Sequence, residues 1–270
     1  MKLLCVIVLI ASIAYTIDAI SSNHLGIIEG TTILPHWAPY LVALVINGSI
    51  NARCGGSLIT ENYVLTAAQC LKYSQKVQVI LGADVITDAS ENTRVSFDVT
   101  KDSYIIHEKF DEGTLENDIA LIQLPSLAIT QNDYIKTIPV VKEGEMDLIG
   151  QEVVTLGWGT VTGIEPFVYS DVPMAVWINV TKNQGSECSD LYGDKIKDTN
   201  ICCTHTNSWD GPSLNLCNGD FGGPLVINYE KLVGIASFSS IPCTMAWPNV
   251  FTDLSKYTSW LLDNSDIKFD

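Results

Sequence analysis

Short runs of hydrophobic residues, separated by polar turns, recur along the whole chain. The runs are rich in Val, Ile and Leu, and Gly, Asn and Asp fill the gaps between them, which is the pattern of short β-strands. The ten predicted strands are Tyr40–Ile46, Ser57–Ile59, Val77–Leu81, Val95–Val99, Ile119–Leu124, Val153–Leu156, Ala175–Val180, Pro224–Ile227, Leu232–Phe238 and Val250–Thr252. The pattern predicts an all-β sandwich or a pair of barrels, and it does not choose between them.

The end of the chain has a different periodicity. Leu254, Tyr257, Leu261 and Leu262 follow helical spacing. Apolar residues that recur in this way form one face of an amphipathic helix. We therefore expect a short C-terminal helix that packs on the second half of the protein.

The beginning of the chain is typical of a secretory signal. Lys2 supplies the positive charge, residues 3–14 form an apolar run, and Ala19 is a small residue at which cleavage can occur. The run is short for a membrane span, so a retained anchor is the less favoured alternative. We expect residues 1–19 to be removed and the protein to be secreted, extracellular.

Composition and charge narrow the possible partners. The 270 residues are 47% hydrophobic and 17% charged, as expected of a globular protein. The formal net charge of −16 argues against nucleic acid and against an anionic membrane, because both need a basic face. The charge permits a basic protein partner, or it serves solubility alone.

Cysteine spacing gives no sign of a metal site, and we expect no cofactor. The Cys-x-x-Cys spacing of zinc sites is absent. The chain has eight cysteines, and removal of Cys5 with the signal leaves seven. An odd number leaves one cysteine unpaired or paired between chains.

Five motifs resemble those of the trypsin/chymotrypsin-like serine proteases. They are Cys54-Gly55-Gly56-Ser57-Leu58, Thr66-Ala67-Ala68-Gln69-Cys70, Asn117-Asp118-Ile119-Ala120-Leu121, Gly157-Trp158-Gly159 and Gly219-Asp220-Phe221-Gly222-Gly223-Pro224. The resemblance covers almost the whole mature chain. It implies two six-stranded antiparallel barrels with the active cleft between them, the first at about residues 27–135 and the second at about 136–270.

Two of the three catalytic residues of that family are replaced. The family's general-base His corresponds to Gln69, whose amide has no useful basicity at neutral pH. The nucleophilic Ser corresponds to Phe221, whose ring has neither a lone pair nor a proton to lose. Asp118 matches the acid that orients the His, and we expect Gln69 and nearby backbone to hydrogen-bond it. The chain's four histidines (His24, His36, His107 and His205) are interpreted as surface residues and not as displaced bases.

The primary specificity pocket is also altered. By resemblance, Asn215 occupies the floor, where trypsin has Asp, and Ser239 and Asn249 replace wall glycines. Ile241 and Pro242 add bulk beside Cys243. We expect a pocket that is narrowed or filled. The alternative is a shifted loop that leaves a pocket of different shape.

The segment Ile27-Ile28-Glu29-Gly30 resembles the mature N-terminus of the family, with residues 20–26 as a short propeptide. In active members the freed ammonium of that first residue inserts beside the Asp that matches Asp220. The residue before the bond is Gly26 and not Lys or Arg, so the segment either is cut by another type of protease or stays uncut. Gly219 and Phe221 correspond to the family's oxyanion hole, which we interpret as vestigial.

The same resemblance implies three disulfides, Cys54–Cys70, Cys217–Cys243 and Cys188 with Cys202 or its neighbour Cys203. Cys202 is favoured, which leaves Cys203 as a buried free thiol or as an intermolecular bridge. Asn47-Gly48-Ser49 and Asn179-Val180-Thr181 match N-glycosylation acceptors, although motifs this short occur often by chance.

These replacements predict a secreted protease homologue that works by binding. The combination most resembles the inactivated protease paralogues of the scabies mite, close to the mite trypsin-like allergens. That resemblance implies release from the mite gut and binding to host complement components, with inhibition of complement activation. We also expect the protein to be a monomer. Alternatives are a non-catalytic cofactor or decoy that regulates another protease, and an enzyme with non-standard chemistry.

Overall fold

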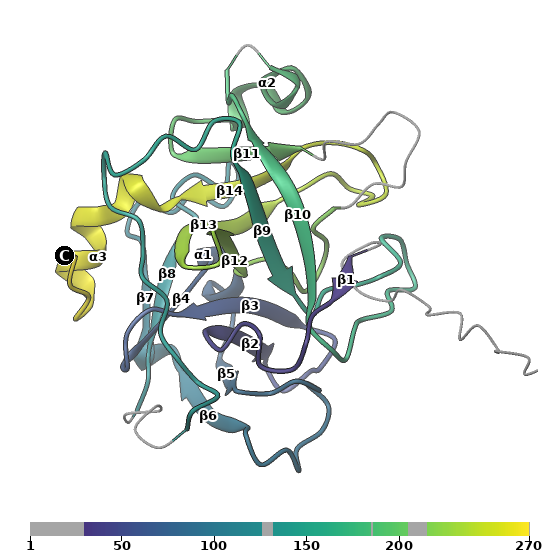
Figure 1. Ribbon diagram of the computed structural model, residues 1–270, viewed down its shortest axis with the longest axis vertical. Helices are drawn as coiled ribbons and strands as arrows, with labels where there is room; N and C mark the ends of the chain where they lie inside the picture. Colours follow the sequence, from purple (N-terminus) through teal and green to yellow (C-terminus); the bar gives the residue numbers. More distant parts are fainter. Residues whose placement is uncertain (1–29, 126–131, 185, 205–214, 270) are drawn as a thin grey trace, which may run out of the picture.

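The computed structural model describes residues 30–125, 132–184, 186–204 and 215–269. Two antiparallel sheets contain the strands of this part of the chain (Figure 1). The strands are β1 (Thr31–Thr32), β2 (Leu41–Ile46), β3 (Arg53–Leu58), β4 (Tyr63–Thr66), β5 (Lys76–Leu81), β6 (Val95–Thr100), β7 (Tyr104–Ile106), β8 (Ala120–Gln123), β9 (Glu152–Gly157), β10 (Met174–Thr181), β11 (Asn200–Thr204), β12 (Pro224–Ile227), β13 (Lys231–Phe238) and β14 (Asn249–Asp253).

The first sheet has the strand order β6-β5-β2-β3-β4-β8-β7. Its two ends are consecutive in the sequence, because only a 3₁₀ turn at Lys101–Ser103 separates β6 from β7. The run from β6 to β7 therefore acts as one interrupted strand that brings both edges of the sheet together. β2 lies in the middle of this barrel, and five of its six residues are buried.

The second sheet closes on itself. β9 pairs with both β10 and β12, and this completes a ring of six strands in the order β10-β11-β14-β13-β12-β9. The short β1 adds to the outside of this ring, where Thr31 and Thr32 pair with Ala175 and Met174. Closure leaves few free strand edges, which is how antiparallel barrels avoid pairing with other chains.

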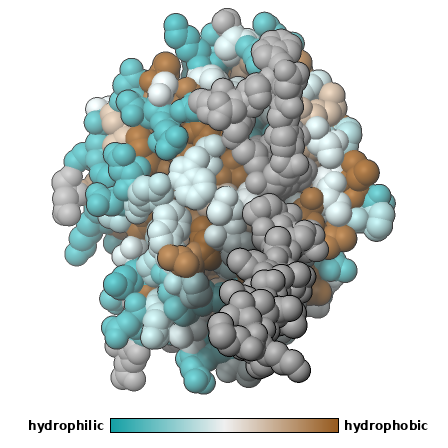
Figure 2. All heavy atoms as spheres, turned by 45° about the vertical axis from the view of Figure 1, so that its right-hand side comes forward, coloured by the Kyte–Doolittle hydropathy of each residue, from teal (hydrophilic) through white to brown (hydrophobic). Residues whose placement is uncertain are grey.

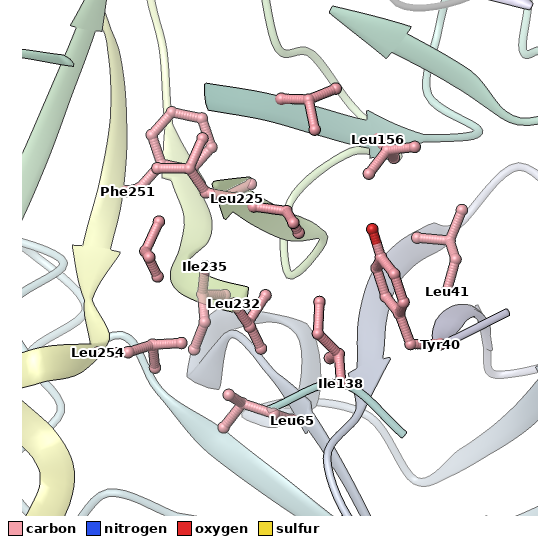
Figure 3. Close-up of a cluster of buried hydrophobic side chains, with 14 of the residues drawn as sticks. Tyr40, Leu41, Leu65, Ile138, Leu156, Leu225, Leu232, Ile235, Phe251 and Leu254 are labelled. Carbon is pink, nitrogen blue, oxygen red and sulfur yellow. The ribbon is translucent and has the colours of Figure 1, made fainter. Parts of the chain in front are cut away.

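Hydrophobic side chains from both barrels form one continuous cluster where the barrels meet. Figure 3 shows Tyr40, Leu41 and Leu65 of the first barrel opposite Leu225, Leu232 and Ile235 of the second. Each fully buried Leu or Ile stabilises the fold by about 1.5–3 kcal/mol relative to an exposed one. The shared core fixes the two barrels relative to each other, and thereby fixes every residue at their junction.

Helices are few and short in the described residues. α1 (Ala68–Leu71) follows β4, and α2 (Glu187–Tyr192) with a 3₁₀ turn at Gly193–Lys195 precedes β11. The chain ends in a 3₁₀ turn at Leu254–Tyr257 and α3 (Thr258–Asn264), which lies at the left edge of the molecule in Figure 1. No described helix has both the length and the apolar character needed to cross a bilayer.

The prediction of two antiparallel barrels with a short C-terminal helix is confirmed. Four strands were not predicted, namely β1, β4, β7 and β11, and β3 begins at Arg53 and not at Ser57. Gly55 and Gly56 in β3 look like turn residues in the sequence, but Gly55 allows a close approach between the barrels and Gly56 a close approach of β3 to Val64 of β4. A Cβ on Gly55 would lie 2.6 Å from the Gly223 Cα, so only glycine fits there.

Candidate functional site

The position that matches the general base of the family lies at the junction of the barrels. Gln69 is in α1, which the Cys54–Cys70 disulfide ties to β3. The Gln69 side-chain nitrogen donates to Asp118 Oδ2 at 2.6 Å and to the Ser237 carbonyl at 2.6 Å. Its backbone N–H donates to Asp118 Oδ1 at 2.9 Å. The glutamine therefore bridges both barrels as a hydrogen-bond donor.

Asp118 lies two residues before β8 and is fully buried. Besides the two bonds from Gln69, its Oδ2 accepts a 2.7 Å hydrogen bond from Ser237 Oγ. The Thr252 hydroxyl donates to the Asp118 carbonyl at 3.0 Å and fixes the backbone. Burial raises the pKa of the Asp118 carboxyl to about 6, and the hydrogen bonds from Ser237 and Gln69 act in the opposite direction.

Phe221 is the residue predicted to stand in place of the family's nucleophile. Its ring is half-buried and packs against the main hydrophobic cluster. Its carbonyl accepts a 2.8 Å bond from the Gly55 N–H, and the next residue, Gly222, donates to the Ala236 carbonyl at 2.8 Å. Gly222 has φ +84°, and a Cβ there would lie 2.3 Å from Thr66 Oγ1. The backbone around Phe221 is thus fixed by both barrels, with a phenyl ring where the family has a hydroxyl.

Gly219 lies two residues earlier in the same loop and has φ +100°. Gly219 and Phe221 are the residues predicted to form a vestigial oxyanion hole, and that role stays a prediction. The loop closes through bonds from the Asp220 N–H to the Cys217 carbonyl and from the Gly223 N–H to the Asp220 carbonyl, both 3.0 Å.

The three altered positions of the specificity pocket are buried and hydrogen-bonded to the pocket walls. The Asn215 amide donates to the Cys243 carbonyl at 2.9 Å and also to the Met245 carbonyl. Asn249 Oδ1 accepts a 2.9 Å bond from the Leu216 N–H, and Ser239 Oγ donates to the Leu216 carbonyl at 2.6 Å. Side chains therefore link the floor segment to both walls.

Ile241 does not fill this pocket, contrary to expectation, because its side chain is 91% exposed. The chain is anchored at the neighbouring Cys243, and the Ile241 side chain projects into solvent. A cavity of about 270 Å³ lies elsewhere, between residues 137–142 and the C-terminal Ile267–Phe269. Asn215, Ser239 and Asn249 do not line it.

Asp220, the predicted partner of the Ile27 ammonium, is fully buried. Its Oδ1 accepts a 2.9 Å bond from the Gly159 N–H and its Oδ2 a 3.1 Å bond from the Cys217 N–H. Burial raises the pKa of the Asp220 carboxyl to about 7, against these hydrogen bonds and the charge of Arg53. Ile27 lies outside the described residues, so its pairing with Asp220 remains a prediction.

Arg53 is the residue of this region that sequence reasoning missed. It is only 7% exposed, and its guanidinium lies 4.7 Å above the centre of the Tyr169 ring. The sequence offered only a weak signal, an arginine directly before the Cys54-Gly55-Gly56 motif in a chain with two arginines, because the predicted strand began at Ser57. Arginine is almost never fully buried without partners, so such a position is informative.

The histidines do not offer a displaced base. His107 is buried and not on the surface as predicted, because it packs between the rings of Tyr257 and Trp260 at 5.5 and 5.3 Å. His36 Nε2 lies 3.1 Å from Asp84 Oδ2. His24 and His205 lie outside the described residues. In the described part of the chain, no group of three or more His, Cys, Asp or Glu side chains could hold a metal ion.

Three disulfides are present, Cys54–Cys70, Cys188–Cys202 and Cys217–Cys243, which are the pairs that the resemblance implies. Cys203 is a free and buried thiol, and its burial raises its pKa well above the ordinary value. Of the two glycosylation candidates, Asn47 lies in an exposed turn with φ +51°, whereas Asn179 is half-buried in β10. Their modification stays a prediction.

With this geometry established, known proteins offer a comparison. The family model described as trypsin matches residues 27–261. A chymotrypsin from Phaedon cochleariae is 34% identical over 244 residues, which cover 90% of this chain and 83% of the relative. A brachyurin from Leptuca pugilator is 33% identical, with 89% and 99% covered, and trypsin I-P1 from Gallus gallus is 35% identical, with 83% of each covered. The chain belongs to the trypsin-like serine protease family.

Proposed function

We propose that this chain is a secreted, catalytically inactive member of its family that acts by binding another protein. The observation that carries the proposal is the pair of residues at the junction of the barrels. Gln69 uses its side-chain N–H groups on Asp118 and the Ser237 carbonyl, and Phe221 has no nucleophilic atom. Loss of triad members in this chemistry costs roughly four to six orders of magnitude in turnover.

The altered pocket supports the same proposal. Hydrogen bonds from Asn215 and Ser239, and one to Asn249, join the floor of the pocket to its two walls. The floor and the walls would have to move apart to admit a substrate side chain. Entry of such a side chain would leave these buried polar groups without partners, which costs about 1–3 kcal/mol for each. Substrate-like binding in the old cleft is therefore disfavoured, and the exterior of the barrels is the surface left for recognition.

The proposed partners are host complement components, with inhibition of complement activation as the outcome. This part rests on the resemblance to the inactivated scabies-mite paralogues and on no contact in the molecule. The charge of −16 favours a partner with a basic face. On the face shown in Figure 2, hydrophobic residues occur in small groups among hydrophilic ones, which fits a largely polar interface. Regulation of another protease, as a cofactor or a decoy, is the alternative.

Catalytic inactivity is tested with the purified secreted chain. A serine-reactive fluorophosphonate should fail to label it, and a library of peptide substrates should show no turnover above the buffer rate. A chymotrypsin-like relative, run in parallel, shows that the assay detects activity. Covalent labelling, or turnover that copurifies with the protein through several columns, would overturn the proposal.

Restoring the two replaced residues tests the pocket separately. The Gln69→His/Phe221→Ser variant should gain at most weak peptide cleavage, because the pocket stays closed. Adding Ser239→Gly, which removes the bond to the Leu216 carbonyl, should raise its kcat/KM. Phe221→Ser alone serves as the control without a base. Efficient cleavage by the double variant would contradict the closed pocket and would leave the inactivity of the native chain intact.

Complement inhibition is tested by deposition of complement on surfaces coated with an activator. The chain at micromolar concentration should reduce deposition, whereas an unrelated protein of similar size and net charge should not. No reduction at that concentration would refute complement as the target. Capture of plasma proteins on the immobilised chain would then test the alternative function, because a cofactor or decoy that regulates a protease should retain a protease.

A further inference from the structure

Two buried charges lie on opposite ends of a single peptide unit. The Arg53 Nη1 donates to the Trp158 carbonyl at 3.3 Å. The N–H of the next residue, Gly159, donates to Asp220 Oδ1 at 2.9 Å. The C=O of Trp158 and the N–H of Gly159 belong to the same peptide group. A guanidinium of β3, in the first barrel, is thus connected to a carboxylate in the degenerate nucleophile loop of the second.

The polarity of that peptide group matches the charges at its ends. Each peptide carries a dipole of about 3.5 D, negative at oxygen and positive at the N–H. The cation faces the oxygen and the carboxylate faces the N–H, so both interactions are favourable. Burial of an ionised side chain is tolerated only where hydrogen bonds and an opposite charge compensate the lost water. Asp220 has the buried Arg53 as its compensating charge.

The remaining contacts fix Arg53 in place. Its Nη1 also donates to the Ser170 carbonyl at 2.8 Å, and its Nε donates to the Ile50 carbonyl at 2.7 Å. All three hydrogen-bond acceptors are neutral carbonyls. Three titratable groups act on its charge, in decreasing order the exposed Asp171, Tyr169 and the buried Asp220; of the two carboxylates, only Asp220 is shielded from water. The hydrogen bonds of the guanidinium therefore supply no negative charge, and the compensating charge has to come from a carboxylate.

Two glycines allow this arrangement. A Cβ on Gly159 would lie 2.2 Å from Asp220 Oδ2, and a Cβ on Gly219 would lie 3.1 Å from Arg53 Cγ. Backbone therefore packs directly against both charged side chains. The loop of residues 217–223 therefore contacts Arg53 through Gly219, and its Asp220 side chain packs against the backbone of Gly159.

We propose that Arg53 is a positioning residue that holds Asp220, and with it the 217–223 loop, in the uncleaved chain. In the family that this chain resembles, an ammonium released by cleavage before the residue that matches Ile27 performs this task. Here an internal guanidinium supplies the positive charge, so the loop is ordered without cleavage at the Gly26–Ile27 bond. The proposal does not depend on which partner the protein binds.

A double-mutant cycle of Arg53→Met and Asp220→Asn tests the coupling at pH 8, by urea unfolding with the disulfides intact. Each single variant should lower the unfolding free energy enough to raise the unfolding equilibrium constant by at least 100-fold. The unfolding equilibrium constant of the double variant should be at least tenfold smaller than the product of the two single effects predicts. Arg53→Lys should recover part of the loss. Effects that multiply to within threefold would refute the coupling.

Two matched variants serve as controls for that cycle. Arg94→Met removes the other arginine, which also donates to backbone carbonyls but is only half-buried and has no bond to the Asp220 loop among its described contacts, and it should show no coupling to Asp220→Asn. A second double-mutant cycle combines Arg53→Met with Asp171→Asn in place of Asp220→Asn. It should give a coupling below threefold because Asp171 is exposed. A larger coupling of Arg53 to Asp171 than to Asp220 would show that Asp171 is its main partner and would refute the proposal.

Hydrogen exchange tests the loop in the folded protein and does not depend on unfolding. The amides of Cys217, Asp220, Gly222 and Gly223 are hydrogen-bonded in the loop. A recognition sequence for a specific protease, placed before Ile27, allows the bond to be cut. Their exchange rates should agree to within threefold before and after cleavage, and should rise at least tenfold in Arg53→Met. A protection that increases more than tenfold on cleavage would show that the new amino terminus, and not Arg53, orders the loop.

Discussion

Asp118 and Asp220 are two fully buried carboxylates that the chain retains at positions where an active family member uses them. They are stabilised in different ways. Asp118 receives three hydrogen bonds from neutral groups, two from Gln69 and one from the Ser237 hydroxyl. Asp220 receives two from backbone N–H groups, and a cation lies beyond one of those peptides.

The difference shows which parts of an inherited site can change. The donors to Asp118 include a side chain, so the residue at position 69 can change while another donor takes its place. The donors to Asp220 are backbone groups held by glycines, so neither their position nor their chemistry can change without moving the loop. The first carboxylate has a side-chain amide among its donors, whereas Gly157, Gly159 and Gly219 pack closely around the Asp220 loop.

The strongest way to break this comparison is Gly159→Ala. The new Cβ would lie 2.2–2.4 Å from three atoms of the Asp220 carboxylate, and backbone holds Asp220 from both sides. Overpacking a core position typically costs 1–3 kcal/mol, and we expect about 3 kcal/mol or more here because the crowded group is a buried charge. Urea unfolding followed by tryptophan fluorescence measures the loss.

Gly113→Ala is the matched control for that substitution. Its Cβ would meet only Asp111 Oδ1 at 3.3 Å, and its φ lies outside the left-handed region. A change within about 0.5 kcal/mol is expected, as for most surface substitutions. Equal losses for the two variants would contradict the special rigidity of the Asp220 site.

The pH dependence of stability separates the two carboxylates. Burial raises the pKa of Asp118 from 3.8 to about 6 and that of Asp220 from 3.8 to about 7. Between about pH 4 and these values the folded protein binds protons that the unfolded chain has lost. Stability therefore falls as pH rises through this window, by at most about 1.4 kcal/mol per pH unit for each group, and levels off above it.

The two asparagine variants assign that slope. Asp118→Asn should flatten the fall up to about pH 6, whereas Asp220→Asn should flatten it up to about pH 7. The charged or titratable groups around Asp220 are Arg53 and, beside it, Tyr169 and Asp171. Asp253, whose pKa burial also raises, contributes equally to the native chain and to both variants. The same residual slope in both variants would show that the two environments do not differ.

Much of the fold could be predicted from the sequence, and so could the hydrogen bond between Gln69 and Asp118 and the three disulfides. The predicted barrels are confirmed because the apolar runs and turn residues repeat the local pattern of β-strands. β4 and β11 were missed because their strand character depends on pairing with β8, β10 and β14, which are distant in sequence. Gly55 and Gly56 concealed the beginning of β3 because a local pattern cannot show that distant backbone, Gly223 of the second barrel in the case of Gly55, packs against them.

Roles that depend on the chemistry of one residue can be predicted from the sequence, whereas contacts that several distant side chains make together cannot. Gln69 and Phe221 are readable one at a time, since an amide and a phenyl ring lack the required groups. The links that Asn215, Ser239 and Asn249 make to Leu216 and Cys243 join residues 23–33 positions apart along the chain. Arg53 is further still from its partners, because it contacts Trp158 and Ser170.

The smallest expected effect sharpens the comparison at Asp118. Gln69→Ala removes one of its three donors and frees the Ser237 carbonyl, so we expect a loss of about 1–2 kcal/mol in urea unfolding. Exposed Gln75→Ala should change stability by less than about 0.5 kcal/mol. Gln69→His restores a ring N–H donor to Asp118 and should recover at least half of the loss. If Gln69→His is no more stable than Gln69→Ala, the site requires the amide itself, and Asp118 is as closely fitted to its neighbours as Asp220.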